Sequence, residues 1–150
     1  MPRLSKKTMF AIEAVLDVAF NASEQPVRSG DITRRQKIPK RYLEQVLQHL
    51  VRAGILAGKR GPRGGYKLGR ERRLISLGEI IRVVRTLEAE TEPDEDTGSA
   101  LAHEVVWPTW HRLREELMSK LDAITIEDLC RDARERGVQR EPGDRLEFQI

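Results

Sequence analysis

The chain has 150 residues, of which 39% are hydrophobic, 34% charged and 5% aromatic. This length suits one domain with at most a small appendage, and the low aromatic content argues against a large sheet sandwich or an aromatic-rich ligand barrel. No run of about 18 apolar residues is present, so we expect no membrane span, and the first residues do not lead into a secretory signal.

The net charge of +3 conceals two oppositely charged halves. Residues 1–75 have a net charge of +11, and residues 76–150 have one of −8. A basic half joined to an acidic half is typical of a polyanion-binding module attached to something else, although solvated surface lysines and arginines are the simpler alternative. The single cysteine, Cys130, excludes a disulfide framework and an all-cysteine metal cage within one chain. We expect a cytoplasmic protein.

Three helices are predicted in the basic half. Residues 5–21 are apolar nearly all round, which predicts a buried central helix with Ser5 as its N-cap. A short helix is expected over 29–36, capped by Ser29. Pro39 then suits the first turn of a third helix, 39–53.

The helix 39–53 is the most informative segment because its two faces differ. Its apolar residues follow helical spacing and are Leu43, Val46, Leu47, Leu50 and Val51. Its other face carries Lys40, Arg41, Glu44, Gln45, Gln48, His49 and Arg52. Two helices joined by about three residues, the second with such a polar face, match the helix-turn-helix pattern.

A hairpin is predicted next. Residues 55–59 and 65–68 are short strand candidates around a tip, 60–64, that is rich in glycine, proline and arginine. The tip fits neither the GxGxxG nor the GxxxxGK[ST] spacing of nucleotide-binding loops. We interpret it as a basic wing that approaches a phosphate chain, the alternative being an exposed hairpin without a ligand.

The acidic half begins with a helix from a Ser76–Glu79 capping box to about residue 87. Residues 88–98 form a like-charge run with a proline, which predicts a mobile acidic linker. A last helix is expected from Thr125 to Gly137, followed by a weakly ordered tail, 138–150.

From residue 99 a helix resumes with a long apolar stripe, and Pro108 predicts a kink or a restart within it. The stripe comprises Leu101, Val105, Trp110, Leu113, Leu117, Leu121 and Ile124. It is too long for a small domain to cover, so we expect it to meet the same helix of a second subunit, with packing onto the first helix as the alternative. The predicted division is therefore a DNA-binding domain, 1–87, a linker, 88–98, and a dimerisation unit, 99–137.

Four segments together resemble a known family. They are Leu4-Ser5, Tyr42-Leu43-Glu44-Gln45, Ala53-Gly54-Ile55-Leu56 and the wing 60–68 with its sequence RGPRGGYKL. The chain resembles, over roughly residues 3–136, the winged helix-turn-helix regulators that include IscR, NsrR and CymR. The segment 124–129 (ITIEDL) is similar to the ITLxDL sequence that follows the dimerisation helix of that family.

The resemblance implies a mainly α fold (α+β), with a two-stranded wing, and a homodimer that binds a pseudo-palindromic double-stranded DNA operator. The expected base-reading residues are Arg41, Tyr42, Glu44, Gln45, Gln48 and, in the minor groove, Arg60. The expected phosphate contacts are Ser5, Lys6, Lys40, His49, Lys59, Arg63, Gly64 and Lys67. The expected dimer interface comprises Leu101, Val105, Trp110, Leu113, Leu117 and Leu121.

The chain departs from the cluster-binding members of that family. Those members carry three cysteines in the segment that is acidic and cysteine-free here, and their histidine ligand aligns with Trp107. We therefore expect no cofactor, no metal and no need for an iron–sulfur cluster. An unusual cluster formed by Cys130 with His103, His111 or acidic oxygens is the alternative. Cys130 is either a small apolar residue or a redox-sensitive thiol sensor.

These observations favour a DNA-binding transcriptional regulator, a repressor that occupies its promoter. The competing hypothesis is a protein-interaction regulator whose acidic half docks a metabolic enzyme. A protein or small-molecule effector is compatible with either hypothesis. An enzyme is not expected, since no nucleophile–base–acid set, metal-ligand spacing or phosphate loop is present.

Overall fold

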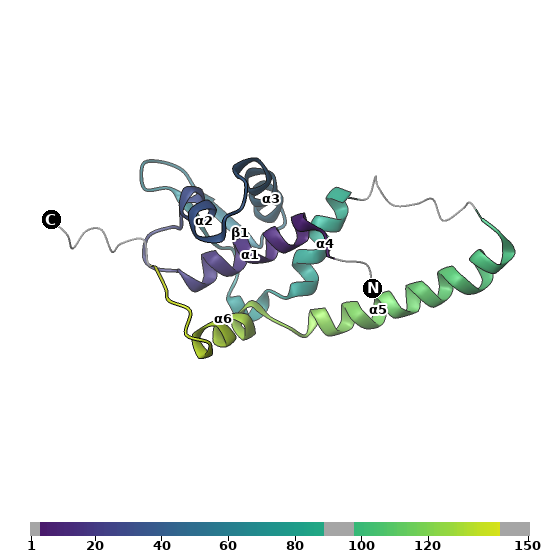
Figure 1. Cartoon of the computed structure of the whole chain (residues 1–150). Coiled ribbons are helices and arrows are strands. Elements are labelled where there is room, and N and C mark those ends of the chain that lie inside the picture. The colour runs from purple at the N-terminus through teal and green to yellow at the C-terminus, as the bar shows by residue number, and fades with distance from the viewer. Residues whose placement is uncertain (1–3, 89–97, 142–150) are drawn as a thin grey trace.

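The computed structural model describes residues 4–88 and 98–141 (Figure 1). In chain order its elements are α1 (Lys6–Phe20), α2 (Ser29–Gln36), α3 (Lys40–Arg52), β1 (Leu56–Lys59), β2 (Gly65–Leu68), the 3-10 turn η1 (Arg72–Leu74), α4 (Leu77–Glu88), the π-helical turn η3 (Ala102–Val106), α5 (Trp107–Asp122) and α6 (Ile126–Glu135). The expected mainly helical fold with a two-stranded wing is confirmed. In the described ranges, no helix has the length and hydrophobicity that crossing a bilayer requires.

Helix α1 is the central support of the core, as its all-round apolar sequence predicts. It contacts α2, α3, α4, α6 and β2, and its residues Ala11, Ala14 and Val15 are completely buried. The backbone N–H of Thr8 donates to the Ser5 hydroxyl at 3.2 Å, which confirms Ser5 as the N-cap. Most of the large apolar side chains of α3, α4 and the wing meet around this helix.

Helices α2 and α3 form the expected helix-turn-helix, but α2 begins differently from the prediction. Arg28 occupies the N-cap position and makes no side-chain cap bond, whereas Ser29 is the first helical residue. The expected Ser29 cap is therefore wrong. Helix α2 is held instead by a buried ion pair, in which Arg35 donates to both carboxylate oxygens of Asp17 at 2.8 and 2.9 Å. Lys37 adopts φ 56°, a left-handed conformation that ends α2 before α3 begins after Pro39.

The wing follows α3 directly. Gly54, at φ 78°, ends the helix as expected, and β1 then pairs antiparallel with β2, Leu56 lying opposite Leu68 and Lys59 opposite Gly65. A third extended segment joins this hairpin, because Val27 pairs with Tyr66 as an isolated antiparallel bridge. The loop before α2 is thus fixed to the wing.

Helices α4 and α6 lie beside α1 and are joined at their starts. The Leu77 N–H donates to the Ile124 carbonyl oxygen, and the Ile126 N–H donates to the Ile75 carbonyl oxygen, each at 2.9 Å. The capping box predicted for α4 is half formed: the Glu79 N–H donates to the Ser76 hydroxyl, while the Glu79 carboxylate pairs with Arg70 at 2.8 Å.

Helix α6 differs from the expected division of the chain. Ile126 and Cys130 are buried in the core against α1, so α6 packs with the residues before 89 rather than forming one unit with α5. Its Thr125–Asp128 capping box and its end near Gly137 agree with the sequence. We call α1 to α4, the wing and α6 the winged body.

We call η3 and α5 the arm, which extends away from the winged body in Figure 1. Met118 is buried where the arm contacts α4, and Arg82 of α4 donates to both carboxylate oxygens of Asp122 at 2.7 and 2.8 Å. The π-helical turn η3 ends just before Pro108, which agrees with the expected restart of the helix. The acidic linker is predicted over 88–98, and its residues 89–97 lie outside the described residues, while Glu88 is the last residue of α4.

The first part of the tail is attached to the winged body, whereas the sequence predicts weak order from residue 138. Arg140 donates to the carbonyl oxygens of Phe20 and Ala22, and the Glu141 N–H donates to the Asn21 side chain at 2.7 Å. The Glu141 carboxylate also pairs with Arg34 at 2.8 Å. These contacts join the chain after α6 to the end of α1 and to α2.

Candidate nucleic-acid interface

The outer face of α3 presents polar side chains because the inner face fills the core. Leu43, Leu47 and Leu50 are completely or almost completely buried. On the opposite side, the exposed residues are Lys40, Arg41, Glu44, Gln45, Gln48 and Arg52. These side chains combine donors, acceptors and positive charge on one helix face, which is the composition that reading base edges in a major groove requires.

Tyr42 lies at the edge of this face and is half-buried. Its ring centroid lies 6.1 Å from that of Phe10 on α1, and the Arg41 guanidinium lies 4.8 Å from the Tyr42 ring centroid. Arg41 also donates to the Tyr42 hydroxyl at 3.0 Å. The aromatic ring therefore connects α1 with α3 and holds the Arg41 guanidinium against Tyr42.

A second basic region lies where α1 begins. A cleft of about 320 Å³ is lined by Ser5, Lys6, Lys7, Phe10, Pro39 and Tyr42. The structure thus brings Lys6 close to the start of α3, as the predicted phosphate contacts require. The Ser5 hydroxyl is already bonded to Thr8 as the helix cap. Lys7 also lines this cleft, and the sequence reasoning had not selected it.

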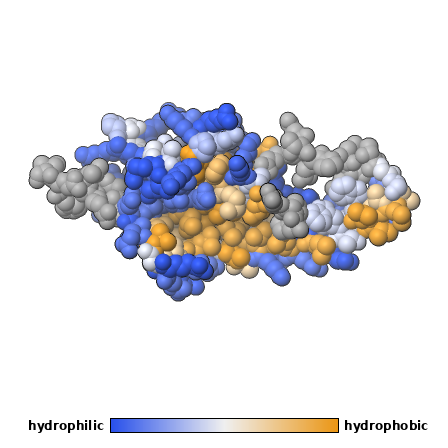
Figure 2. Space-filling model, viewed as in Figure 1, coloured by the Kyte–Doolittle hydropathy of each residue, from blue (hydrophilic) through white to orange (hydrophobic). Residues whose placement is uncertain are grey.

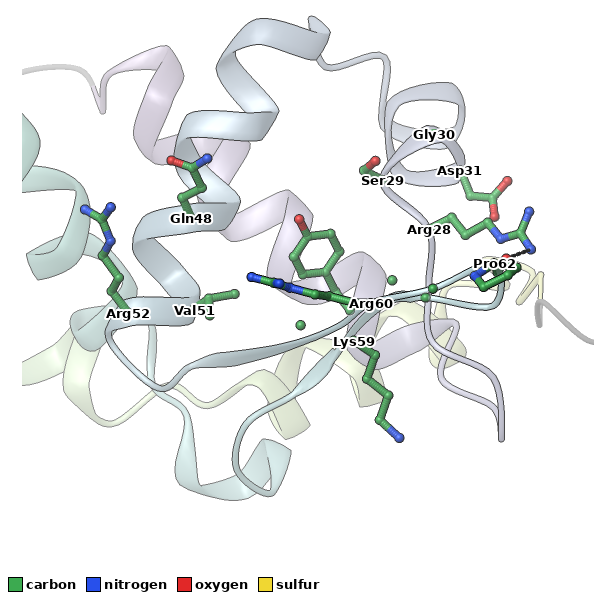
Figure 3. Close-up of a pocket in the computed structure, with 15 residues that line it drawn as sticks. Arg28, Ser29, Gly30, Asp31, Gln48, Val51, Arg52, Lys59, Arg60 and Pro62 are labelled. Carbon is green, nitrogen blue, oxygen red and sulfur yellow. Dashed lines mark hydrogen bonds between the residues drawn. The ribbon is translucent and has the colours of Figure 1, made fainter.

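A groove lies between the wing and the helix-turn-helix (Figure 3). Its volume is about 1070 Å³, and its basic lining residues are Arg28, Arg52, Lys59 and Arg60, with Asp31 as the acidic one. Figure 3 shows the Arg60 side chain lying across the groove towards α3, whereas the Lys59 side chain points away from it. Arg28 was missed because nothing in the sequence places the loop before α2 against the wing.

Three predicted phosphate contacts have structural surroundings that the sequence could not reveal. The Lys67 ammonium donates to the Glu24 carbonyl oxygen at 2.9 Å, so it fixes the loop before α2 to the wing. His49 is half-buried near the end of α3. At Gly64 a Cβ atom would collide with the Lys59 carbonyl oxygen, which explains why the tight tip needs glycine there.

Cys130, the candidate thiol sensor, is completely buried between α6 and the core. Burial raises the pKa of its thiol above the ordinary range, and the neighbouring Arg72 offsets this shift only in part. A buried thiol with a raised pKa contains little of the reactive thiolate. Of the two interpretations of Cys130, a small apolar residue or a thiol sensor, this environment matches the small apolar residue.

The residues of the predicted dimer stripe differ in exposure along the arm. Leu101 is 72% exposed and Leu113 is 47% exposed, and Val105 is also exposed. Trp110, Leu117 and Leu121 are half-buried. The stripe is thus largely uncovered at its outer end and partly covered where α5 reaches α4.

The residues present do not fit the metal site that cluster-binding relatives require. The sequence supplies one cysteine, and its sulfur lies inside the core rather than at a surface. Within residues 4–88 and 98–141, no three His, Cys, Asp or Glu side chains come together in a way that could hold a metal ion. A cluster held by three cysteine thiolates cannot be assembled from this donor set.

Comparison with known proteins identifies the family to which this winged helix-turn-helix fold belongs. Residues 4–132 match the Rrf2 family, described as iron-dependent transcriptional regulators. The HTH-type transcriptional regulator IscR of Photobacterium profundum is 36% identical over 138 residues, which are 87% of this chain and 76% of that protein.

Two solved structures share the fold. That of T. potens IscR has a TM-score of 0.73 and 31% identity, covering 93% of this chain and 94% of the other. That of CymR, the global cysteine regulator of B. subtilis, has a TM-score of 0.67 and 32% identity, covering 87% and 97%. The chain therefore belongs to the Rrf2 family and is a DNA-binding transcriptional regulator with a winged helix-turn-helix fold.

Proposed function

We propose that the protein is a homodimeric repressor that binds a pseudo-palindromic operator without an iron–sulfur cluster. The observation that carries the proposal is that Gln48 and Arg52, from the outer face of α3, line one basic groove together with Arg60. A helix in the major groove and an arginine in the adjacent narrow minor groove can then be engaged from the same side of the duplex.

Base reading is assigned to the exposed residues of α3. Glu44 is the informative residue, since a carboxylate on a basic surface is repelled by phosphate and is best explained as an acceptor for a cytosine amino group. Gln45 and Gln48 lie on the same exposed face and can read either donors or acceptors.

Positioning on the DNA backbone is assigned to the basic residues around that face. Lys6, Lys40, Lys59 and Arg63 are exposed and supply charge on both sides of α3. Such contacts give affinity without sequence preference and make binding strongly dependent on salt. Lys67 is a weaker candidate, because its ammonium is bonded to the Glu24 carbonyl oxygen.

Dimerisation is assigned to the arm. Figure 2 shows hydrophobic surface over α1 in the middle of the molecule and again at the outer end of the arm. The outer patch contains Leu101, Val105 and Val106, each more than half exposed. Exposed apolar surface of this kind, on a helix that leaves the winged body, is typical of an interface between subunits.

We propose regulation without a cluster because the side chains described above cannot supply three cysteine ligands. An effector would act on the angle between the two winged bodies, because displacement of the α3 helices from the groove repeat of about 34 Å lowers affinity. The docking of a partner enzyme on the acidic half remains compatible with this scheme.

The experiment is a salt titration of DNA affinity with the full chain, prepared free of metal, on a duplex selected from a random library. We expect a palindromic selected sequence and a logarithmic salt slope that corresponds to several phosphate contacts. A flat slope would show that the basic half has another use. Binding that appears only after reconstitution with iron and sulfide would overturn the cluster-independent part of the proposal.

A further inference from the structure

The base of the wing is attached to the loop before α2 by main-chain atoms. The Val27 N–H donates to the Tyr66 carbonyl oxygen at 2.9 Å, and the Tyr66 N–H donates to the Val27 carbonyl oxygen at 2.7 Å. Gly65, at φ 153°, makes this approach possible, because a Cβ there would collide with the Val27 carbonyl. This attachment does not depend on any side chain of the tip.

The tip of the wing is attached by a side chain. Arg28, the residue before α2, donates from Nη2 to the Pro62 carbonyl oxygen at 3.0 Å across 34 positions of sequence. Figure 3 shows the Arg28 side chain reaching the wing at Pro62, while Arg60 extends from the same hairpin towards α3. The start of the helix-turn-helix is thus linked to the segment that carries Arg60.

We propose that Arg28 is a positioning residue for DNA recognition, which holds the wing tip against the start of α2 and so sets where Arg60 meets the DNA. The proposal rests on the wing contact assigned under Proposed function. In this role Arg28 need not touch DNA, because it acts on how the wing fits the operator.

The physical reason lies in the composition of the tip. Glycines at 61 and 64 give the segment 60–64 high conformational freedom, and Gly61 has φ 108°. Ordering such a segment on DNA costs conformational entropy, which lowers affinity unless the segment is ordered beforehand. Within the tip, the Gly64 N–H donates to the Gly61 carbonyl oxygen at 2.9 Å, and the Arg28–Pro62 bond adds to that order in the unbound protein by joining the tip to α2. The Arg28–Pro62 bond is charge-assisted on the donor side.

A direct role is the competing explanation, because Arg28 is exposed and lines the same groove. The two roles differ in their coupling to Arg60. If Arg28 acts through the tip, its removal has little effect once Arg60 has been removed. If Arg28 neutralises a phosphate, the two losses add, and the logarithmic salt slope falls by about one contact.

The test is a double-mutant cycle with Arg28→Ala, Arg60→Ala and the double variant, measured on the duplex that the wild-type protein selects. We expect Arg28→Ala to weaken binding about threefold to tenfold, the range for one such hydrogen bond. In the Arg60→Ala background, the same change should weaken binding less than twofold. Arg28→Gln, which keeps an N–H donor and loses the charge, should recover part of the loss.

Arg63→Ala is the matched control, because it removes one positive charge from the tip and leaves Arg28 and Pro62 in place. We expect its loss to add to that of Arg60→Ala, with a smaller salt slope. Backbone relaxation of residues 60–64 in the unbound protein should show more motion in Arg28→Ala than in Arg63→Ala, with thermal unfolding unchanged in both.

The outcomes separate the two proposals. If Arg60→Ala leaves affinity unchanged, the wing contact itself is wrong and Arg28 cannot act through it. If Arg60→Ala weakens binding but the losses of Arg28 and Arg60 add, the wing contact stands and the positioning role is overturned. Unchanged motion of the tip in Arg28→Ala would also overturn it.

Discussion

The winged body and the arm differ in how far their large apolar side chains are buried. In the winged body, ten residues from Ile32 to Ile126 with large side chains are almost completely inaccessible, and they come from α2, α3, α4, α6 and the intervening segments. In the arm, Met118 is buried, whereas Leu101, Val105 and Leu113 are exposed. The winged body therefore has a buried core of its own, whereas the outer part of the arm has none and exposes the apolar surface that we propose a second subunit covers.

The largest expected effect is on the core of the winged body. Leu47 is completely buried on the inner face of α3, so Leu47→Ala should lower the free energy of unfolding by about 2–5 kcal/mol. Urea unfolding measures this loss, which should not depend on protein concentration. Leu101→Ala is the control from the arm, and its smaller loss should depend on concentration because the partner we propose for Leu101 is another subunit. Equal, concentration-independent losses would contradict the distinction.

The next effect concerns the dimer. Leu113→Glu places a charge in the exposed part of the stripe, so light scattering should report monomers, and operator affinity should fall by roughly 100-fold or more because two half-sites no longer act together. Ser119→Glu adds the same charge at an exposed polar position of α5 and should leave the dimer intact. A dimer of unchanged mass in Leu113→Glu would remove the arm from the interface.

A smaller effect is expected on sequence preference when the outer face of α3 is changed. Glu44→Ala should relax the preference at one base pair by about 1–3 kcal/mol, while affinity for unrelated DNA rises or stays the same because a negative charge is lost. Selection from a random library, repeated with the variant, measures this change. Gln36→Ala is a control on α2, since Gln36 bonds to Asp17 inside the protein. An unchanged preferred sequence would move base reading away from Glu44.

The junction between the winged body and the arm should respond to acid. Hydrogen bonds from Arg82 lower the pKa of the Asp122 carboxyl below its ordinary value of 3.8. A carboxyl whose pKa is lower in the folded state stabilises that state above the ordinary value, and the contribution is lost as pH falls through the lowered pKa. The thermal midpoint should therefore fall less between pH 5 and pH 3 in Asp122→Asn than in the wild type. An identical fall would show that this ion pair adds nothing to stability.

The smallest effect is expected at Cys130. Because the thiol is buried and its pKa is raised, peroxide should leave operator affinity unchanged in the metal-free wild type and in Cys130→Ala alike. Electrophoretic mobility shift with and without peroxide measures this. A loss of binding in the wild type that Cys130→Ala abolishes would restore the thiol-sensor hypothesis.

The local features of this protein could be predicted from its sequence alone. The cap at Ser5, the two faces of α3, the helix stop at Gly54 and the glycine-rich tip follow from hydrogen bonding and periodicity over a few neighbouring residues. The outer face of α3 and the wing were predictable for the same reason. The roles in DNA binding that we propose for them follow from the order of these segments, which matches the family.

Features that depend on residues far apart in the sequence could be found only in the folded structure. Asp17 is a buried partner of Arg35, Cys130 lies inside the core, and Glu141 bonds to α1 and α2. Arg28 meets Pro62 only because main-chain pairing brings the loop before α2 to the wing. Charge, capping and periodicity are local properties, whereas burial and pairing arise when distant segments are brought together by the core, and this is why one sequence could predict the first and not the second.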